Sequence, residues 1–179
     1  MPTTLETRFQ PTVELLDSVV ADGGSIAGLV LSSPSNPTGT MLDIDRMTQI
    51  TSWCRANGVW FVSDEIYHGL SYGEPAPTAL QFDPDAIVIN SFSKYFSMTG
   101  WRLGWLVMPE DLRESLTRIG QNVTISAPTL SQLGAIAALL VAGFVTWTLL
   151  GARESARQRG QRSEGGGVAA AYTGARQQA

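Results

Sequence analysis

The sequence predicts an α/β fold, a three-layer α/β/α sandwich built on a mostly parallel sheet. Two observations carry this prediction. Short apolar runs are typical of strands buried on both faces of a parallel sheet. Helical patterns separate these runs, which favours helices on both sides of the sheet. The predicted strands are residues 26–32, 59–63, 86–90 and 103–108.

The first strand leads into a loop and then into a helix. Residues 26–32 (IAGLVLS) are followed by the turn-forming residues SPSNPTG, which predict the loop. Asp43 can cap a helix that runs to about Asn57, and Gly58 follows as a stop signal. Apolar residues recur along this helix at helical spacing: Ile44, Met47, Ile50 and Cys54. Cys54 is therefore expected to fill the core.

Each remaining strand ends at polar or turn-forming residues. VWFVS (59–63) ends at Asp64 and Glu65, AIVIN (86–90) runs into SFSK, and LGWLVM (103–108) is closed by Pro109. Two further helices are predicted: an amphipathic one over residues 110–119 and a largely apolar one over residues 128–142. The tryptophans at 53, 60, 101 and 105 are expected to pack rather than to act in chemistry.

The composition excludes several classes of protein. The chain has 179 residues, a net charge of −4 and a pI near 4.9, which argues against nucleic-acid binding. One cysteine and one histidine exclude an internal disulfide and a His/Cys metal cage. Residues 1–10 carry no basic-then-apolar signal pattern. We therefore expect a cytoplasmic protein.

The C-terminal part differs from the rest in composition. No charged residue occurs over 121–152, and the stretch 134–150 is at the lower limit of length for a membrane span. Because glycine and alanine dilute it, a core-facing helix and no membrane contact are expected. Residues 151–179 are rich in Gly, Ala, Arg and Gln, with Val168 and Tyr172 as the only large apolar residues. Such a segment is expected to be disordered.

Polar residues gather where the predicted strands end. Asn36 follows the first strand, Asp64 the second, and Ser91, Ser93 and Lys94 the third. Ligands of open parallel sheets bind beyond the carboxyl ends of the strands. This placement predicts one shared site.

Three segments together resemble a known family. SPSNPTG (33–39), DEIY (64–67) and SFSKYFSMTGWRLG (91–104) occur in the order and spacing of the class I/II aminotransferases. These are pyridoxal-phosphate (PLP) enzymes of the aspartate aminotransferase fold type. The resemblance covers about residues 8–140. It implies a partial PLP-binding large domain, amino acid and 2-oxo acid substrates, and a homodimer in the intact enzyme.

The resemblance also implies a role for each matching residue. Lys94 is the catalytic residue, because only a lysine amine forms an imine with the cofactor aldehyde and can then move a proton. Asp64 holds the proton on the ring nitrogen, and Asn36 and Tyr67 match the residues at the phenolic oxygen. Arg102, Ser91 and Ser93 match the phosphate ligands. A cis peptide bond is implied at Asn36–Pro37. His68 is left as a surface or rim residue.

The chain also departs from the family. Intact members are about twice this length. No glycine-containing phosphate loop or ring-stacking aromatic is recognisable before Ser33. The resemblance ends near residues 140–143, and the later composition is typical of a shifted reading frame in a GC-rich gene. We therefore expect a partial large domain over 1–143 and a divergent tail over 144–179, with turnover impaired by truncation.

Three alternatives stay open at this point. A PLP lyase or synthase of the same fold would keep the same lysine, aspartate and tyrosine. A regulator domain would bind PLP without turnover. A non-functional remnant would explain the unusual tail.

Overall fold

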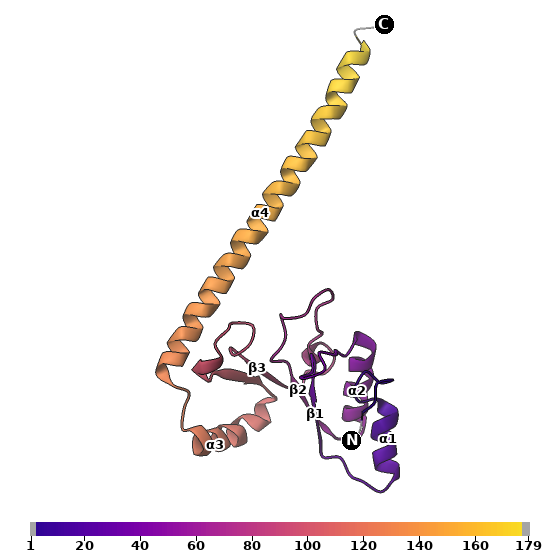
Figure 1. The fold of residues 1–179 in the computed structure, drawn as a ribbon, viewed down its shortest axis with the longest axis vertical. Coiled ribbons are helices and arrows are strands. Elements are labelled where there is room, and N and C mark those ends of the chain that lie inside the picture. Colours follow the sequence, from indigo (N-terminus) through magenta and orange to yellow (C-terminus); the bar gives the residue numbers. More distant parts are fainter. Residues whose placement is uncertain (1–2, 177–179) are drawn as a thin grey trace. The chain divides into compact units, whose positions relative to one another are not determined.

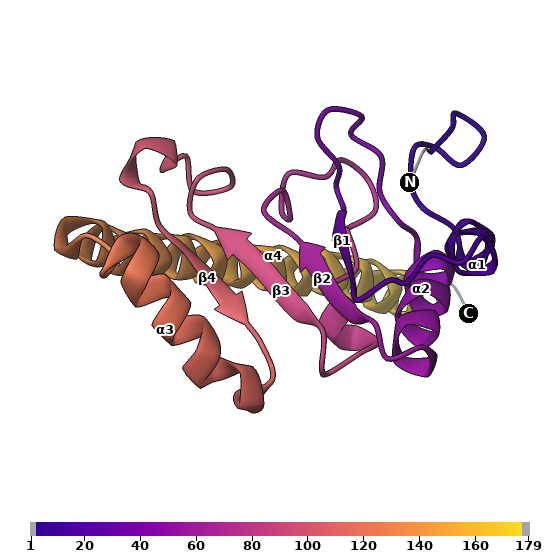
Figure 2. The ribbon, with the colours of Figure 1, turned by 90° about the horizontal axis from the view of Figure 1, so that it is seen from below.

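A four-stranded sheet forms the centre of the protein. The computed structural model describes the backbone of residues 3–176 and the side chains of residues 3–154. The strands are β1 (Gly28–Ser32), β2 (Trp60–Asp64), β3 (Ile87–Ser91) and β4 (Gly104–Val107), in the order β1-β2-β3-β4. The first three strands are parallel and β4 pairs antiparallel with β3 (Figure 2). All four predicted strands and the mostly parallel sheet are confirmed.

Two helices cover one face of this sheet. Helix α1 (Val13–Ala21) begins where the Thr12 hydroxyl accepts a hydrogen bond from the Leu15 amide. Helix α2 (Ile44–Ala56) begins at Asp43, whose carboxylate accepts from the Arg46 amide at 2.8 Å, as the sequence predicts. The two helices lie side by side (Figure 1). Helix α1 was not predicted, although Thr12 is a favoured capping residue.

The core lies between α2 and the sheet. Side chains alternate along a strand, and Leu29, Leu31, Phe61 and Val88 point to the face that α2 covers. They pack into one buried cluster with residues of both helices, among them Leu16, Met47, Ile50 and Cys54. Cys54 is fully buried, which confirms its predicted place in the core.

Helix α2 offers a matched pair of substitutions for testing this core. Ile50 is 1% exposed and Ile44 is 62% exposed. Ile50→Ala is expected to lower the free energy of unfolding by about 2–5 kcal/mol, because it leaves a cavity. Ile44→Ala is expected to change it by about 0.5 kcal/mol or less. Urea unfolding followed by circular dichroism measures both, and equal losses would contradict this assignment of the core.

Burial also determines the reactivity of Cys54. Removal from water raises the pKa of the thiol to about 11, and the negative charge of Asp83 adds to this effect. The thiol stays protonated at pH 8, and the thiolate is the reactive form. We expect 5,5′-dithiobis(2-nitrobenzoate) to label Cys54 in 6 M urea but not in the folded chain. Rapid labelling of the folded chain would contradict its burial.

The opposite face of the sheet is only partly covered. Val30 is 71% exposed and Trp60 is 44% exposed. Helix α3 (Arg113–Thr124) follows a short 3-10 turn, Glu110–Leu112. This turn and α3 together stand where the sequence predicted one helix over 110–119. Leu116 of α3 lines a hollow with Ile89 and Leu106. Within residues 3–132, the second helical layer of the predicted sandwich is thus present only near β3 and β4.

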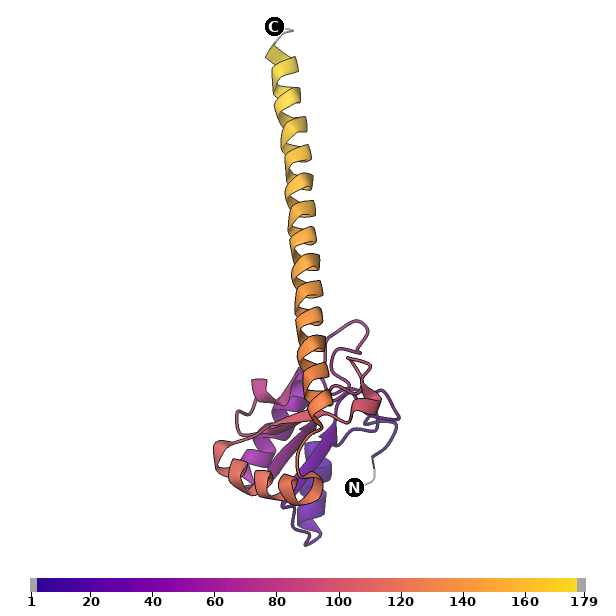
Figure 3. The ribbon, with the colours of Figure 1, turned by 90° about the vertical axis from the view of Figure 1, so that its left-hand side faces the viewer.

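The chain divides into two units after Gln132. Helix α4 spans Thr129–Arg176 as one continuous helix (Figure 3). The predicted apolar helix over 128–142 is confirmed but does not end there. Residues 144–176 belong to this helix, and the divergent, disordered or non-native tail expected over 144–179 stays a prediction. Residues 177–179 lie outside the described part, and the division at residue 143 stays a prediction.

Helix α4 contains an unusually apolar segment. The most apolar 18-residue window within Thr129–Glu154 has a mean hydropathy of 2.2, and the segment is long and apolar enough to cross a membrane. The core helix of a soluble protein satisfies the same criteria of length and composition. The expectation that this helix faces a protein core therefore stays a prediction.

Candidate functional site

Three loops meet at one edge of the sheet. They span residues 33–43, 65–86 and 92–103, and each follows the carboxyl end of one parallel strand. Because β1, β2 and β3 run in the same direction, these ends share one edge (Figure 2). The predicted site residues, apart from Asp64 and Ser91 at the strand ends, lie on these loops. The peptide bond Asn36–Pro37 is cis as expected, and Ser33–Pro34 is cis as well.

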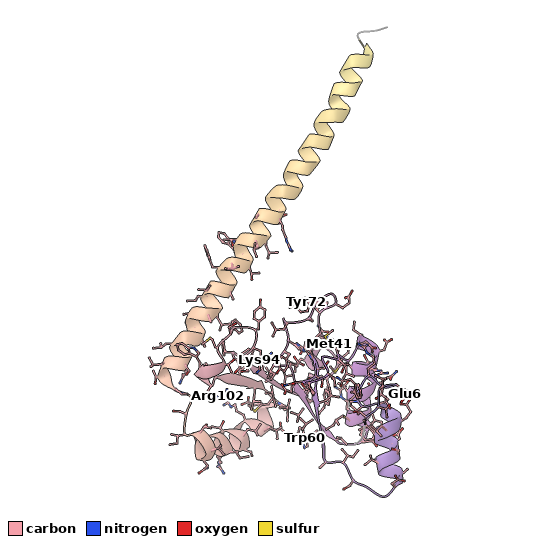
Figure 4. The ribbon with its side chains drawn as sticks, viewed as in Figure 1. Glu6, Met41, Trp60, Tyr72, Lys94 and Arg102 are labelled. Atoms are coloured by element: carbon pink, nitrogen blue, oxygen red, sulfur yellow. The ribbon has the colours of Figure 1, made fainter. Side chains whose placement is uncertain are left out.

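The first group of site residues comes from all three loops. The Asn36 amide donates a hydrogen bond to the Tyr67 hydroxyl, with 3.1 Å between Nδ2 and the oxygen. Lys94 Nζ lies 5.4 Å from the centre of the Tyr67 ring, which is within the range of a cation–π contact. Figure 4 shows the position of Lys94 on the loop after β3. An amine, a phenol and an amide therefore lie together.

Asp64 is the last residue of β2. In the sheet it lies between Ser32 of β1 and Ile89 of β3. Its side chain is half-buried, and its carboxylate accepts a hydrogen bond from the Ile66 amide at 3.2 Å. The carboxylate thus lies in the middle of the sheet edge, between the loops that carry Asn36 and Lys94 and at the start of the loop that carries Tyr67.

The residues matched to a phosphate lie at the end of β3 (Ser91) and on the loop between β3 and β4 (Ser93 and Arg102). Ser91 Oγ donates to the Leu103 carbonyl at 3.2 Å and accepts from the Ser93 amide at 2.9 Å. Arg102 is exposed, has a left-handed backbone with φ 51°, and donates to the Thr99 carbonyl at 3.1 Å. Figure 4 shows Arg102 and Lys94 on the same loop. The loop brings these residues together, and their binding of a phosphate stays a prediction.

Two residues of the second loop were missed by sequence reasoning. Glu65 is buried, and the His68 side chain is only 18% exposed. His68 contacts both Glu65 and the Ser33 carbonyl, so this partly buried side chain has internal partners that the sequence did not reveal. A signal for this contact was present in the sequence: Glu65 lies three residues before the only histidine, just after a predicted buried strand.

Comparison with known proteins decides the family. The family model described as aminotransferase class I and II matches residues 1–162. The chain belongs to this aminotransferase family. The match continues past residues 140–143, where the resemblance of the motifs ends.

Relatives of this aminotransferase chain agree with the assignment. It is 46% identical over 140 residues to a valine–pyruvate aminotransferase of Mycobacterium tuberculosis, covering 77% of this chain and 35% of that protein. An aspartate aminotransferase of Bacillus subtilis is 32% identical, with 74% and 35% covered. The chain spans about a third of the length of the curated relatives it matches.

Solved structures of aminotransferases share the fold. A structure from Silicibacter pomeroyi gives a TM-score of 0.71 at 48% identity and covers 81% of this chain and 38% of that one. An aminotransferase structure from Mycobacterium tuberculosis gives 0.70 at 46% identity, with 77% and 37% covered. A Thermus thermophilus aspartate aminotransferase mutant gives 0.70 at 28% identity. These neighbours confirm the α/β class and a partial domain.

Enzymes of this aminotransferase family use PLP. The groups at the sheet edge fit that molecule by their chemistry. PLP presents an aldehyde for an amine, a ring nitrogen for a carboxylate, a phenolic oxygen for hydrogen-bond donors, and a phosphate for cations and hydroxyls. Lys94, Asp64, the Asn36–Tyr67 pair and the 91–102 loop provide these groups in that order.

Proposed function

We propose that this chain is the cofactor-binding part of an aminotransferase that moves an amino group from an amino acid to a 2-oxo acid. One observation carries the proposal: the only lysine of the sequence lies over the Tyr67 ring, and Tyr67 is hydrogen-bonded to Asn36. Three remote segments of the aminotransferase motif thus converge on one amine.

Each side chain has a task that follows from its chemistry. Lys94 holds the cofactor through its amine and, once displaced, moves a proton at the substrate α-carbon. The Asp64 carboxylate holds a proton at the ring nitrogen. The Asn36 amide and the Tyr67 hydroxyl bind the phenolic oxygen. When bound, PLP supplies an electron sink for the charge that develops at the α-carbon.

The 91–102 loop has the phosphate task in this proposal. Arg102 provides a planar guanidinium that suits a phosphate, and Ser91 and Ser93 provide hydroxyl groups. In the present structure Arg102 donates to the Thr99 carbonyl, and the Thr99 hydroxyl donates to the Ser93 carbonyl at 2.8 Å. These contacts hold the guanidinium on the loop that carries both serines.

The proposal includes a homodimer and a cytoplasmic location. Family membership supports the dimer, and sedimentation of the purified chain tests it. The only cysteine of the sequence is a buried free thiol, which agrees with a reducing compartment.

The direct test is covalent capture of the cofactor. The purified chain is mixed with PLP, the visible absorption is recorded, and borohydride is added before peptide mapping by mass spectrometry. The expected result is a visible band and a reduced adduct on Lys94. Absence of an adduct on Lys94 would refute the proposal. An adduct without any transamination at high substrate concentration would instead identify a non-catalytic PLP-binding chain.

A further inference from the structure

The proposed function gives no task to Glu65, which is 2% exposed. Its Oε1 atom accepts three hydrogen bonds: from Ser63 Oγ at 3.1 Å, from Thr78 Oγ1 at 3.1 Å and from the Ala79 amide at 2.8 Å. Oxygen Oε1 is therefore fully engaged in the protein interior. The second oxygen, Oε2, faces His68.

His68 connects this carboxylate to the first loop. Its Nε2 lies 3.0 Å from the Ser33 carbonyl oxygen, and its Nδ1 lies 3.4 Å from Glu65 Oε2. A carbonyl oxygen only accepts, so Nε2 carries the proton of that hydrogen bond. We call this arrangement the Glu65–His68–Ser33 bridge.

The bridge joins the same two loops as the Asn36–Tyr67 hydrogen bond. Tyr67 directly precedes His68, and Ser33 opens the segment that carries Asn36. The far end of that segment is also tied to Ser33, because the Leu42 amide donates to Ser33 Oγ at 3.0 Å. Ser33 is also held by its own amide, which donates to the Asp64 carbonyl at 3.2 Å. The position of Asn36 relative to Tyr67 thus depends in part on where His68 holds the Ser33 carbonyl.

We propose that the Glu65–His68–Ser33 bridge is a positioning device that sets Asn36 and Tyr67 for binding the phenolic oxygen of PLP. Glu65 and His68 are positioning residues, acting through Asn36 and Tyr67. This inference rests on the proposed function, since it assigns a support to the same site.

Three variants separate the bridge from general damage. His68→Phe keeps a ring of similar size and removes both contacts of the bridge. Glu65→Gln keeps an Oε1 acceptor for its three donors, and its amide can donate to Nδ1 while Nε2 still donates to Ser33. Thr78→Val removes one hydrogen bond of the same carboxylate without touching the bridge, and so serves as the matched control.

The first readout needs no cofactor. Hydrogen exchange of backbone amides is measured by mass spectrometry for each variant. His68→Phe is expected to speed exchange about tenfold or more over residues 33–42, because the hydrogen bond from His68 to the Ser33 carbonyl is lost. Helix α2 is expected to be unchanged. Glu65→Gln and Thr78→Val are expected to exchange like the wild type over residues 33–42.

The second readout is the bound cofactor. His68→Phe is expected to bind PLP about tenfold more weakly, since donors at the phenolic oxygen are misplaced. The pH midpoint of the visible band is expected to rise. A phenolic oxygen with weaker hydrogen-bond donors carries more negative charge, and it therefore holds the proton on the neighbouring Lys94 nitrogen more tightly. Glu65→Gln is expected to leave both values as they are in the wild type.

The outcomes distinguish the inference from the proposed function. Unchanged exchange over residues 33–42 in His68→Phe overturns the bridge as a positioning device. Faster exchange with unchanged affinity and pH midpoint also overturns it, because the bridge is then only structural. A wild-type chain that forms no adduct on Lys94 overturns the proposed function, and the inference falls with it. Changes in both readouts in His68→Phe that are absent from Glu65→Gln and Thr78→Val support the inference.

Discussion

Lys94→Arg is expected to abolish the borohydride-stable PLP adduct at position 94. Arginine keeps the positive charge but its guanidinium forms no imine, so the loss isolates the amine chemistry from the charge. The measurement is peptide mapping after reduction. Lys94 is the only lysine of the sequence, so the N-terminal amine is the only other primary amine that can react.

A relocated lysine provides the control for this prediction. Arg118 lies on the exposed surface of α3 and pairs with Glu114 at 2.5 Å. The double variant Lys94→Arg, Arg118→Lys has one lysine, as the wild type does, but at a surface position. It is expected to show no more labelling than the N-terminal amine alone. Equal labelling of the relocated lysine and of Lys94 would show that the site adds no specificity.

Asp64→Asn is expected to weaken PLP binding by about 10- to 100-fold. A hydrogen bond between charged groups contributes about 1.5–3 kcal/mol, and the neutral amide cannot hold a proton on the ring nitrogen by charge. Asparagine keeps an oxygen that can accept from the Ile66 amide, so the turn after β2 is preserved. Titration of the visible band with PLP measures the affinity.

An exposed aspartate offers the comparison for Asp64. Asp85 lies on the loop before β3 and is exposed, so Asp85→Asn removes the same charge away from the sheet edge. Its affinity for PLP is expected to match that of the wild type. If both variants lose affinity for PLP equally, the loss comes from the change in net charge. That result would contradict the assignment of Asp64 to the ring nitrogen.

Much of the fold could be predicted because it depends on local patterns. The strands over 59–63 and 86–90 are continuous apolar runs, and helix α2 has both a capping aspartate and helical spacing. Helix α1 was missed although Thr12 caps it as Asp43 caps α2, by accepting a hydrogen bond from the amide three residues further on. The sequence predicted an apolar helix only over 128–142, and α4 continues beyond it to Arg176, through a glycine-rich segment whose composition gives no signal for a helix.

The sequence by itself determined the family motif, the single amine available for chemistry and the strand ends at which polar residues gather. Only the tertiary structure decided which of these residues touch. Asn36 and Tyr67 are 31 positions apart, and His68 and Ser33 are 35 apart. Such pairs meet because β1 and β2 align in parallel, with Ser32 beside Asp64, and so start their loops at the same level. No local pattern encodes that register, which explains why the partners of His68 and Asn36 became visible only in the fold.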